Sequence, residues 1–162
     1  MLTITNGQLR DAFLTPQMLA YFEKKLVHLS AAEIGVRIEE ALKFLNIAVY
    51  CEGDIPVTEE IDEVWHYWIL ETKEYERLCR KLQGRKFLHH SSNDYRKLFG
   101  HIFDEEADLA SNIAMLGTYV LNYGPFEADR VKYWRLAAHL VDNQGWSVER
   151  LNAWLGEVAQ LA

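Results

Sequence analysis

The fold class is decided by residues 58–84, which read TEEIDEVWHYWILETKEYERLCRKLQG. Apolar side chains recur in this stretch every three or four residues, the spacing that gathers them on one face of an α-helix. These side chains are Ile61, Trp65, Trp68, Tyr75, Cys79 and Leu82. Acidic residues crowd the first turns and basic residues the last, which is the order that the helix dipole favours. The stretch therefore predicts one amphipathic helix, with Thr58 as its N-cap and Gly84 at its end.

The same kind of pattern extends over the rest of the chain. Capping residues, or apolar residues at helical spacing, occur in residues 15–29, 30–52, 95–123, 127–141 and 148–160. Strand-like alternation of any length and internal repeats are both missing from the sequence. We therefore expect an all-α fold, a bundle of five to seven helices that forms a single domain over residues 1–162.

Length and composition are those of an ordinary globular domain. The chain has 162 residues, of which 49% are hydrophobic and 25% charged, with nine glycines and three prolines. These values exclude collagen-like, low-complexity and disordered proteins. The formal net charge of −7 argues against a general affinity for nucleic acids, because phosphate backbones repel an acidic protein.

The cysteine content and the length of the apolar runs indicate the cellular compartment of the protein. Cys51 and Cys79 lie far apart in segments that read as helices, so we expect two reduced thiols rather than a disulfide. The first residues lack the basic and apolar regions of a secretory signal peptide. No uninterrupted apolar run reaches the roughly 18 residues of a membrane span. These features predict a cytoplasmic protein without a membrane partner.

Charge is distributed unevenly along the chain. Residues 77–97 carry seven basic residues against one acidic residue, an excess of +6, whereas the remaining residues sum to −13. Such a basic segment can bind a phosphate, another anionic ligand or an acidic protein. The candidate residues for anion or partner binding are Arg77, Lys81, Arg85, Lys86 and the outward-facing Tyr67. The alternative is a solvated helix end in which Glu76 pairs with Arg80.

Histidines adjoin this basic segment. Asp62 and His66 are four residues apart on the predicted helix and can form a hydrogen bond, and His89 and His90 follow in a loop that can fold back. One interpretation is a metal site on Asp62, His66, His89 and His90 that takes zinc, iron or manganese. A second is a buried polar knot that holds the loop against the helix. A third is acid–base catalysis without a metal.

The same residues carry a resemblance to a family. The motif consists of Asp62, Trp65, His66, Ile69, Leu70, Thr72, Tyr75, Gly84, His89 and His90. Its order resembles the helical domain of the glycine-rich domain-containing proteins and of related uncharacterised bacterial proteins. The later part of that pattern is matched by Thr118-Tyr119, Tyr123-Gly124-Pro125 and Trp134. The resemblance spans about residues 58–134 and implies a helical fold without a defined enzymatic activity. Trp68 stands where family members often carry a second histidine.

Two classes of function follow from these features. The first is a small helical protein-interaction or regulatory module with a polarised charge surface and a structural Asp/His knot, whose partner is another protein. The second is a metal-dependent or acid–base enzyme centred on Asp62, His66, His89 and His90. A third, an inhibitor that binds a basic protein, depends on net charge alone. The sequence predicts neither an oligomeric state nor a set of catalytic residues.

Overall fold

A computed structural model describes residues 2–51, 53–91 and 105–161 of the chain. The described residues form eight α-helices and two short 3-10 helices, and they contain no strand beyond one isolated bridge. The α-helices are α1 (Asn6–Phe13), α2 (Pro16–Lys25), α3 (Ala31–Ile47), α4 (Glu59–Leu70), α5 (Thr72–Lys81), α7 (Glu105–Tyr123), α8 (Arg135–Asp142) and α9 (Val148–Gln160). The 3-10 helices are η1 (Ala48–Tyr50) and η2 (Val131–Tyr133). The all-α prediction is confirmed, but five to seven helices was too few.

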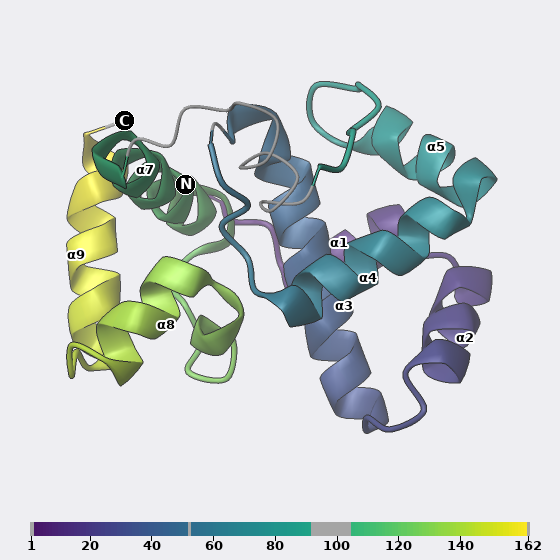
Figure 1. Ribbon diagram of the computed structural model, residues 1–162, viewed down its shortest axis with the longest axis horizontal. Helices are drawn as coiled ribbons and strands as arrows, with labels where there is room; N and C mark the ends of the chain where they lie inside the picture. The colour runs from purple at the N-terminus through teal and green to yellow at the C-terminus, as the bar shows by residue number, and fades with distance from the viewer. Residues whose placement is uncertain (1, 52, 92–104, 162) are drawn as a thin grey trace.

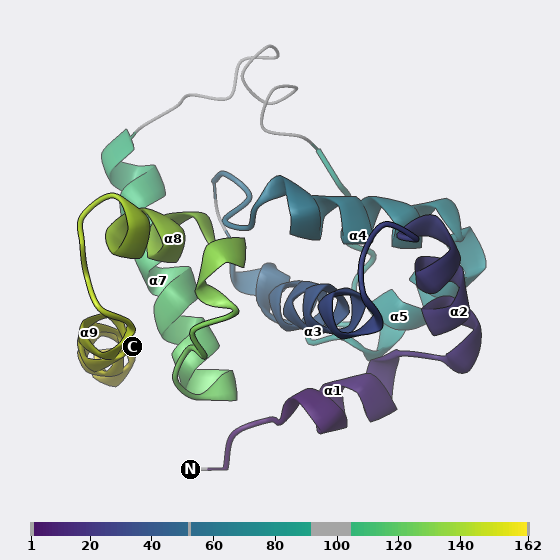
Figure 2. The same cartoon turned by 90° about the horizontal axis from the view of Figure 1, so that it is seen from below.

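Helix α3 forms the centre of the molecule. Every residue from 38 to 47 is buried, because α3 is covered on one side by α1, α2 and α4 and on the other by α7. Figures 1 and 2 both show α3 between a group made of α2, α4 and α5 and a group made of α7, α8 and α9. None of the helices in the described ranges has the length and apolar character needed to cross a bilayer.

The helix predicted over residues 58–84 is broken in two. Glu71 leaves the helical conformation, with φ −92° and ψ 76°, and Figure 1 shows α5 turned away from the axis of α4. The reason lies in a side-chain contact: Trp65 Nε1 donates a hydrogen bond of 2.9 Å to Tyr75 Oη. In a continuous helix these residues would be about 15 Å apart along the axis. The break therefore allows two buried aromatic residues to meet.

The helix predicted near residues 127–141 begins later than expected, at Arg135. Trp134 is extended and pairs with Val57 in the isolated bridge, while Thr58 N donates to Tyr133 O at 3.0 Å. Residues 131–133 form the 3-10 helix η2, and pairing with another part of the chain keeps Trp134 extended immediately before α8. Thr58 is the N-cap residue of α4 as predicted, with an extended backbone, but its side chain makes no capping hydrogen bond.

Capping explains most of the other helix starts. Thr15, Ser30 and Ser147 each accept a hydrogen bond from a backbone N–H of the following turn, as their positions in the sequence predict. Helix α1 was missed, although Thr5 and Gln8 form a reciprocal capping box there. The helical pattern predicted for residues 95–123 lies partly outside the described residues, which show helix from residue 105 onward.

Candidate functional site

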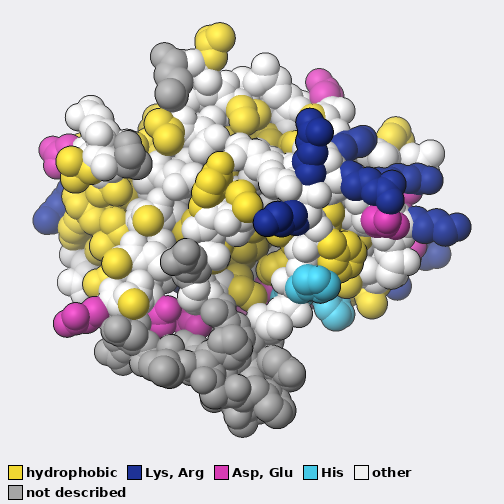
Figure 3. Space-filling model, turned by 90° about the horizontal axis from the view of Figure 1, so that it is seen from above, with side chains coloured by type: hydrophobic (Ala, Val, Ile, Leu, Met, Phe, Trp, Pro, Cys, Tyr) yellow, Lys and Arg dark blue, Asp and Glu magenta, His cyan; other side chains and the backbone are white. Residues whose placement is uncertain are grey.

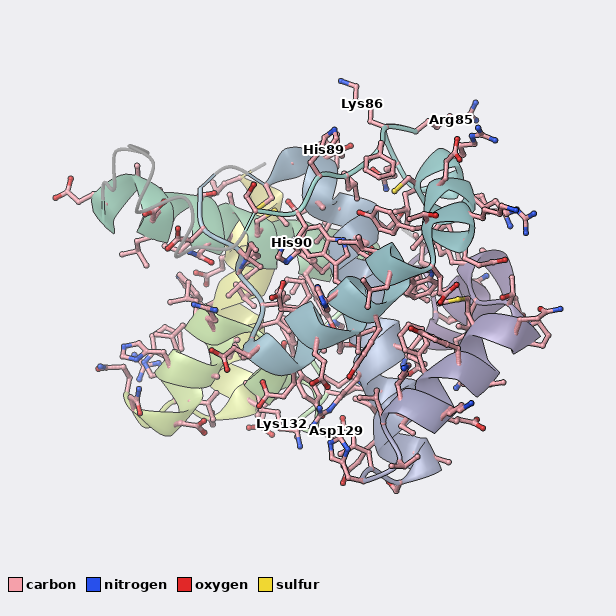
Figure 4. All side chains as sticks on the ribbon, turned by 45° about the vertical axis from the view of Figure 1, so that its right-hand side comes forward. Arg85, Lys86, His89, His90, Asp129 and Lys132 are labelled. Atoms are coloured by element: carbon pink, nitrogen blue, oxygen red, sulfur yellow. The ribbon has the colours of Figure 1, made fainter. Side chains whose placement is uncertain are left out.

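The loop that follows α5, residues 85–91, is held against α4 by a short contact between His90 and Asp62. His90 Nε2 lies 2.5 Å from Asp62 Oδ1, and the His90 ring packs edge-on against Trp65 at 4.4 Å between ring centroids. The two side chains are only partly accessible, with 18% of His90 and 33% of Asp62 exposed. Figure 4 shows His90 lying over α4. The carboxylate of Asp62 thus contacts His90, not the neighbouring His66 that helix spacing alone suggested.

A second contact holds the same loop two residues earlier. Tyr75 of α5 receives the hydrogen bond from Trp65 and donates its own hydroxyl to the carbonyl oxygen of Leu88. Burial raises the pKa of the Tyr75 phenol, so it stays protonated and remains a donor at neutral pH. Phe87 packs against Tyr75 at 5.2 Å in an edge-to-face arrangement. The loop is therefore anchored at both Leu88 and His90.

The predicted metal centre is not assembled. Within the residues that the structure describes, no group of three or more His, Cys, Asp or Glu side chains is placed to hold a metal ion. His66 is exposed on α4, and His89 is exposed and packs against Phe87 at 5.0 Å. Neighbouring residues of an extended chain point to opposite sides, so only His90 turns toward α4. Of the four predicted ligands, the structure brings together Asp62 and His90, and zinc, iron or manganese finds no adequate ligand set there.

The basic residues form a continuous exposed surface, which we call the basic face. It consists of Lys73, Arg77, Arg80, Lys81, Arg85 and Lys86. The four from α5 recur at helical spacing and lie away from the buried side of that helix, which carries Tyr75, Leu78 and Cys79. Figure 3 shows Lys and Arg side chains gathered at one end of the molecule with histidine beside them.

Within the described residues, acidic side chains neutralise the basic face only in part. Glu74 pairs with Arg77 at 3.1 Å and Glu76 with Arg80 at 2.6 Å. The second pair is the one expected for a simple solvated helix end. The cations without an ion pair to the described part of the chain are Lys73, Lys81, Arg85 and Lys86. Arg96 and Lys97, which belong to the basic segment of the sequence, lie outside the described residues.

Tyr67, the aromatic residue predicted to contact a partner, is engaged within the fold. Its ring packs edge-to-face against Tyr21 of α2, with 6.4 Å between centroids, and the residue is half-buried. We therefore do not include Tyr67 in the basic face.

A cavity of about 330 Å³ opens beside the basic face, and we call it the α5 cavity. It is lined by Thr72, Glu76, Cys79, Arg80, Arg85 and Phe87. A second cavity, of about 210 Å³, lies where the end of α3 and the following residues meet α4 and the anchored loop, with Phe44, Trp65, Leu88 and His89 among its lining residues. The anchored loop thus contributes lining residues to both cavities.

A buried network of hydrogen bonds and ion pairs surrounds Glu40 and was not predicted from the sequence. This fully buried carboxylate lies 2.8 Å from Lys43 Nζ and 3.1 Å from Arg130. It also accepts hydrogen bonds from Tyr119 Oη at 2.8 Å and Trp134 Nε1 at 3.2 Å. The network joins α3 to α7 and to the residues before α8. A sequence signal for it is the placement of Glu40 and Lys43, three residues apart, among apolar residues of the predicted helix.

Two pKa shifts reflect this burial. The pKa of the Tyr119 phenol is raised by burial and by the adjacent charge of Glu40. Burial by itself would lower the pKa of Arg130, but the hydrogen bonds and charges of Glu39 and Glu40 outweigh it and raise that pKa. Glu39 pairs with Arg130 at 2.9 Å and with Arg10 at 3.1 Å, which extends the network to α1. The network joins buried side chains of several elements and stabilises the packing of the helices.

Comparisons with known proteins found no protein similar to this chain. No protein-family model matches it, and neither a curated protein nor a solved structure matches it.

Proposed function

We propose that this protein is a helical interaction module that binds an acidic segment of another protein through the basic face. The observation that carries the proposal is the exposed row of cations on α5, continued by Arg85 and Lys86 at the start of the anchored loop. Clustered cations attract an acidic partner and accelerate its association.

The anchoring of the loop supports this proposal. Free loops lose conformational entropy when they bind, which weakens affinity. Here the contacts of Leu88 and His90 hold the loop before any partner arrives. Arg85 and Lys86 are therefore displayed on a segment of defined position; Figure 4 shows both at the outer edge of the molecule. We assign the Asp62–His90 pair to this positioning role.

A protein partner fits the basic face better than a nucleic acid. The face is limited to one helix and one turn, whereas the chain as a whole carries a net charge of −7. An extended polyanion would meet acidic surface beyond the basic face. A short acidic peptide would contact the cations alone.

The family resemblance is compatible with this role. We propose that the chain is a divergent member of the glycine-rich domain-containing group. Asp62, Trp65, Tyr75 and His90 of the motif are the residues whose side chains hold the loop. In this interpretation the motif encodes the anchored loop, which explains why its members are spread over almost 30 positions.

Charge reversal tests the proposed function. The probe is a fluorescein-labelled peptide of 12 residues that alternates glutamate with alanine, measured by fluorescence anisotropy at low and high ionic strength. We expect the peptide to bind the wild-type protein and to bind Lys81→Glu/Arg85→Glu at least about tenfold more weakly, because two attractive charges become repulsive.

The matched control is Lys132→Glu/Arg150→Glu, which changes net charge equally at exposed positions elsewhere (Figure 4 labels Lys132). This control is expected to keep most of the affinity. Equal loss in both double variants, or tighter binding of a single-stranded oligonucleotide than of the peptide, would contradict the proposal.

A further inference from the structure

The α5 cavity lies between the buried side of α5 and the basic face. Thr72, Glu76 and Cys79 follow one another at helical spacing, so they form a row along α5. Tyr75 and Leu78 lie on one side of this row and pack into the core, whereas Lys73 and Arg77 lie on the other side and are exposed. A side chain of a partner that enters the cavity would therefore lie next to the cations of the basic face.

The inner lining of the cavity is apolar. Cys79 is 2% exposed and lies at its inner side, and Phe87 forms a wall from the anchored loop. Half of the Phe87 surface is exposed although its ring is held against Tyr75. An exposed aromatic ring in a fixed position provides a surface on which another ring can pack edge-on or offset.

The charges at the cavity distinguish between two kinds of occupant. Arg80 and Arg85 line it, but Glu76 also does, and its carboxylate is 2.6 Å from Arg80. A phosphate or carboxylate inside the cavity would face the negative charge of Glu76. A neutral aromatic ring meets no such repulsion and can pack under a guanidinium.

We infer that the α5 cavity receives one aromatic side chain of the acidic partner, whose neighbouring carboxylates then contact the basic face. The inference rests on the proposed function and specifies the partner as an acidic segment interrupted by Phe, Tyr or Trp. A cavity of about 330 Å³ is at the small end of ligand-binding pockets and suits a single side chain. Aromatic anchors in such pockets contribute much of the binding energy of an interface.

The conformation of Arg85 provides independent support. Its backbone has φ 48°, the left-handed region, which costs a non-glycine residue energy relative to glycine. An arginine at this position is not explained by local backbone preference, and the structure gives it no ion pair within the described residues. Its guanidinium is available to the cavity and to the basic face.

Three peptides test the inference. Each has 12 residues with glutamate at alternate positions, and the central residue is Trp, Leu or Ala. We expect the Trp peptide to bind the wild-type protein at least about 30-fold more tightly than the Ala peptide, the effect of one interface anchor. The Leu peptide is expected to bind between the two, because it offers apolar contact without a ring.

Two variants locate the anchor. Thr72→Trp places a large side chain at the cavity from an exposed position, and Phe87→Ala removes its aromatic wall. Both are expected to reduce the advantage of the Trp peptide over the Ala peptide to less than about threefold. The control Gln17→Trp adds the same side chain at an exposed position near the start of α2. Circular dichroism melting of each variant establishes that it is folded.

The outcomes separate the two proposals. Equal binding of the Trp and Ala peptides, with both weakened by Lys81→Glu/Arg85→Glu, would overturn the aromatic anchor and leave the acidic partner in place. Equal binding of the Leu and Trp peptides would overturn the aromatic preference. A lack of binding by all three peptides would overturn both proposals.

Discussion

Arg85 adopts a backbone conformation that is unfavourable for a residue with a side chain. Its left-handed backbone conformation directly follows that of Gly84, which has φ 83° and turns the chain back toward α4. Glycine is the residue best suited to such conformations, whereas an L-residue with a side chain is disfavoured there. Residues that stay in a disfavoured conformation are found preferentially at functional sites.

Replacement of Arg85 by glycine therefore separates stability from binding. We expect Arg85→Gly to match or exceed the wild-type free energy of unfolding by up to about 1 kcal/mol, because the backbone strain is relieved. Affinity for the acidic peptides should fall. Urea titration and fluorescence anisotropy measure the two effects on the same samples. A variant that loses stability and keeps its affinity would contradict this view of Arg85.

Glu40 shows the opposite case, a charged residue that serves stability. Glu40→Gln keeps the shape of the side chain but leaves Lys43 and Arg130 without this buried countercharge. We expect the free energy of unfolding to fall by about 3 kcal/mol or more, the usual result when one partner of a buried ion pair is removed. The control Glu149→Gln, on the exposed surface of α9, should change it by less than about 0.5 kcal/mol. Urea denaturation followed by tryptophan fluorescence provides the comparison.

Because of its buried tyrosines, the free energy of unfolding of the protein should depend on pH in the alkaline range. Burial raises the pKa of Tyr75, Tyr119 and Tyr123, so the folded state keeps these phenols protonated. The unfolded chain releases their protons near pH 10, the ordinary value for tyrosine. Above that pH the native state binds more protons than the unfolded state, and the free energy of unfolding falls as pH rises. Below it these groups contribute no pH dependence.

Absorbance of phenolate at 295 nm measures this behaviour. Of the eight tyrosines in the chain, these three should ionise only together with unfolding, in a step that coincides with loss of the circular dichroism signal. Tyr119→Phe should reduce the slope of stability against pH above pH 10. A smooth titration of all eight tyrosines in the folded protein would contradict the prediction.

At the scale of elements, the break between α4 and α5 and the loop after α5 act together. The break lets Tyr75 reach Trp65, and Tyr75 in turn holds the loop at Leu88. The Asp62–His90 pair adds a second attachment to α4. These contacts position the aromatic wall of the α5 cavity and the cations of the turn. The candidate site is therefore a property of two helices and a loop in combination.

Removal of one attachment should loosen this loop selectively. In Asp62→Ala we expect faster hydrogen exchange of the backbone amides in residues 85–91, because His90 loses its carboxylate partner. Global stability should fall by only about 1 kcal/mol, since the pair is partly exposed. Glu63→Ala, one residue further along the same turn, is the matched control. Exchange mass spectrometry that finds residues 85–91 equally protected in both variants would remove the positioning role.

At the scale of the whole molecule, α3 joins two groups of helices. Glu39 and Glu40 connect α1, α7 and the residues before α8 through Arg10, Tyr119 and Arg130. Gly117 of α7 allows close approach to α9, because a Cβ atom there would lie 2.9 Å from Val158. The group opposite these helices carries the basic face. Helix α5, which carries four residues of the basic face, thus lies on the opposite side of α3 from α7, α8 and α9 (Figure 1).

Local patterns in the chain were sufficient to establish the fold class. Apolar spacing and capping residues act within a few positions of each other, so α2, α3 and α9 begin where Thr15, Ser30 and Ser147 indicate. The basic row on α5 follows from the same helical periodicity. These features need no knowledge of distant contacts, and the sequence by itself determined them.

The partners of individual side chains depended on contacts between distant parts of the chain. Asp62 meets His90 rather than His66 because the loop returns over α4, and Tyr75 meets Trp65 because the helix breaks at Glu71. Trp134 departs from helix because it pairs with Val57, next to the hydrogen bond that Thr58 N donates to Tyr133 O. Packing energies of several kcal/mol outweigh local helix preferences of less than about 1 kcal/mol per residue. Helical spacing therefore indicated which residues share a face, and only the tertiary structure decided which of them meet.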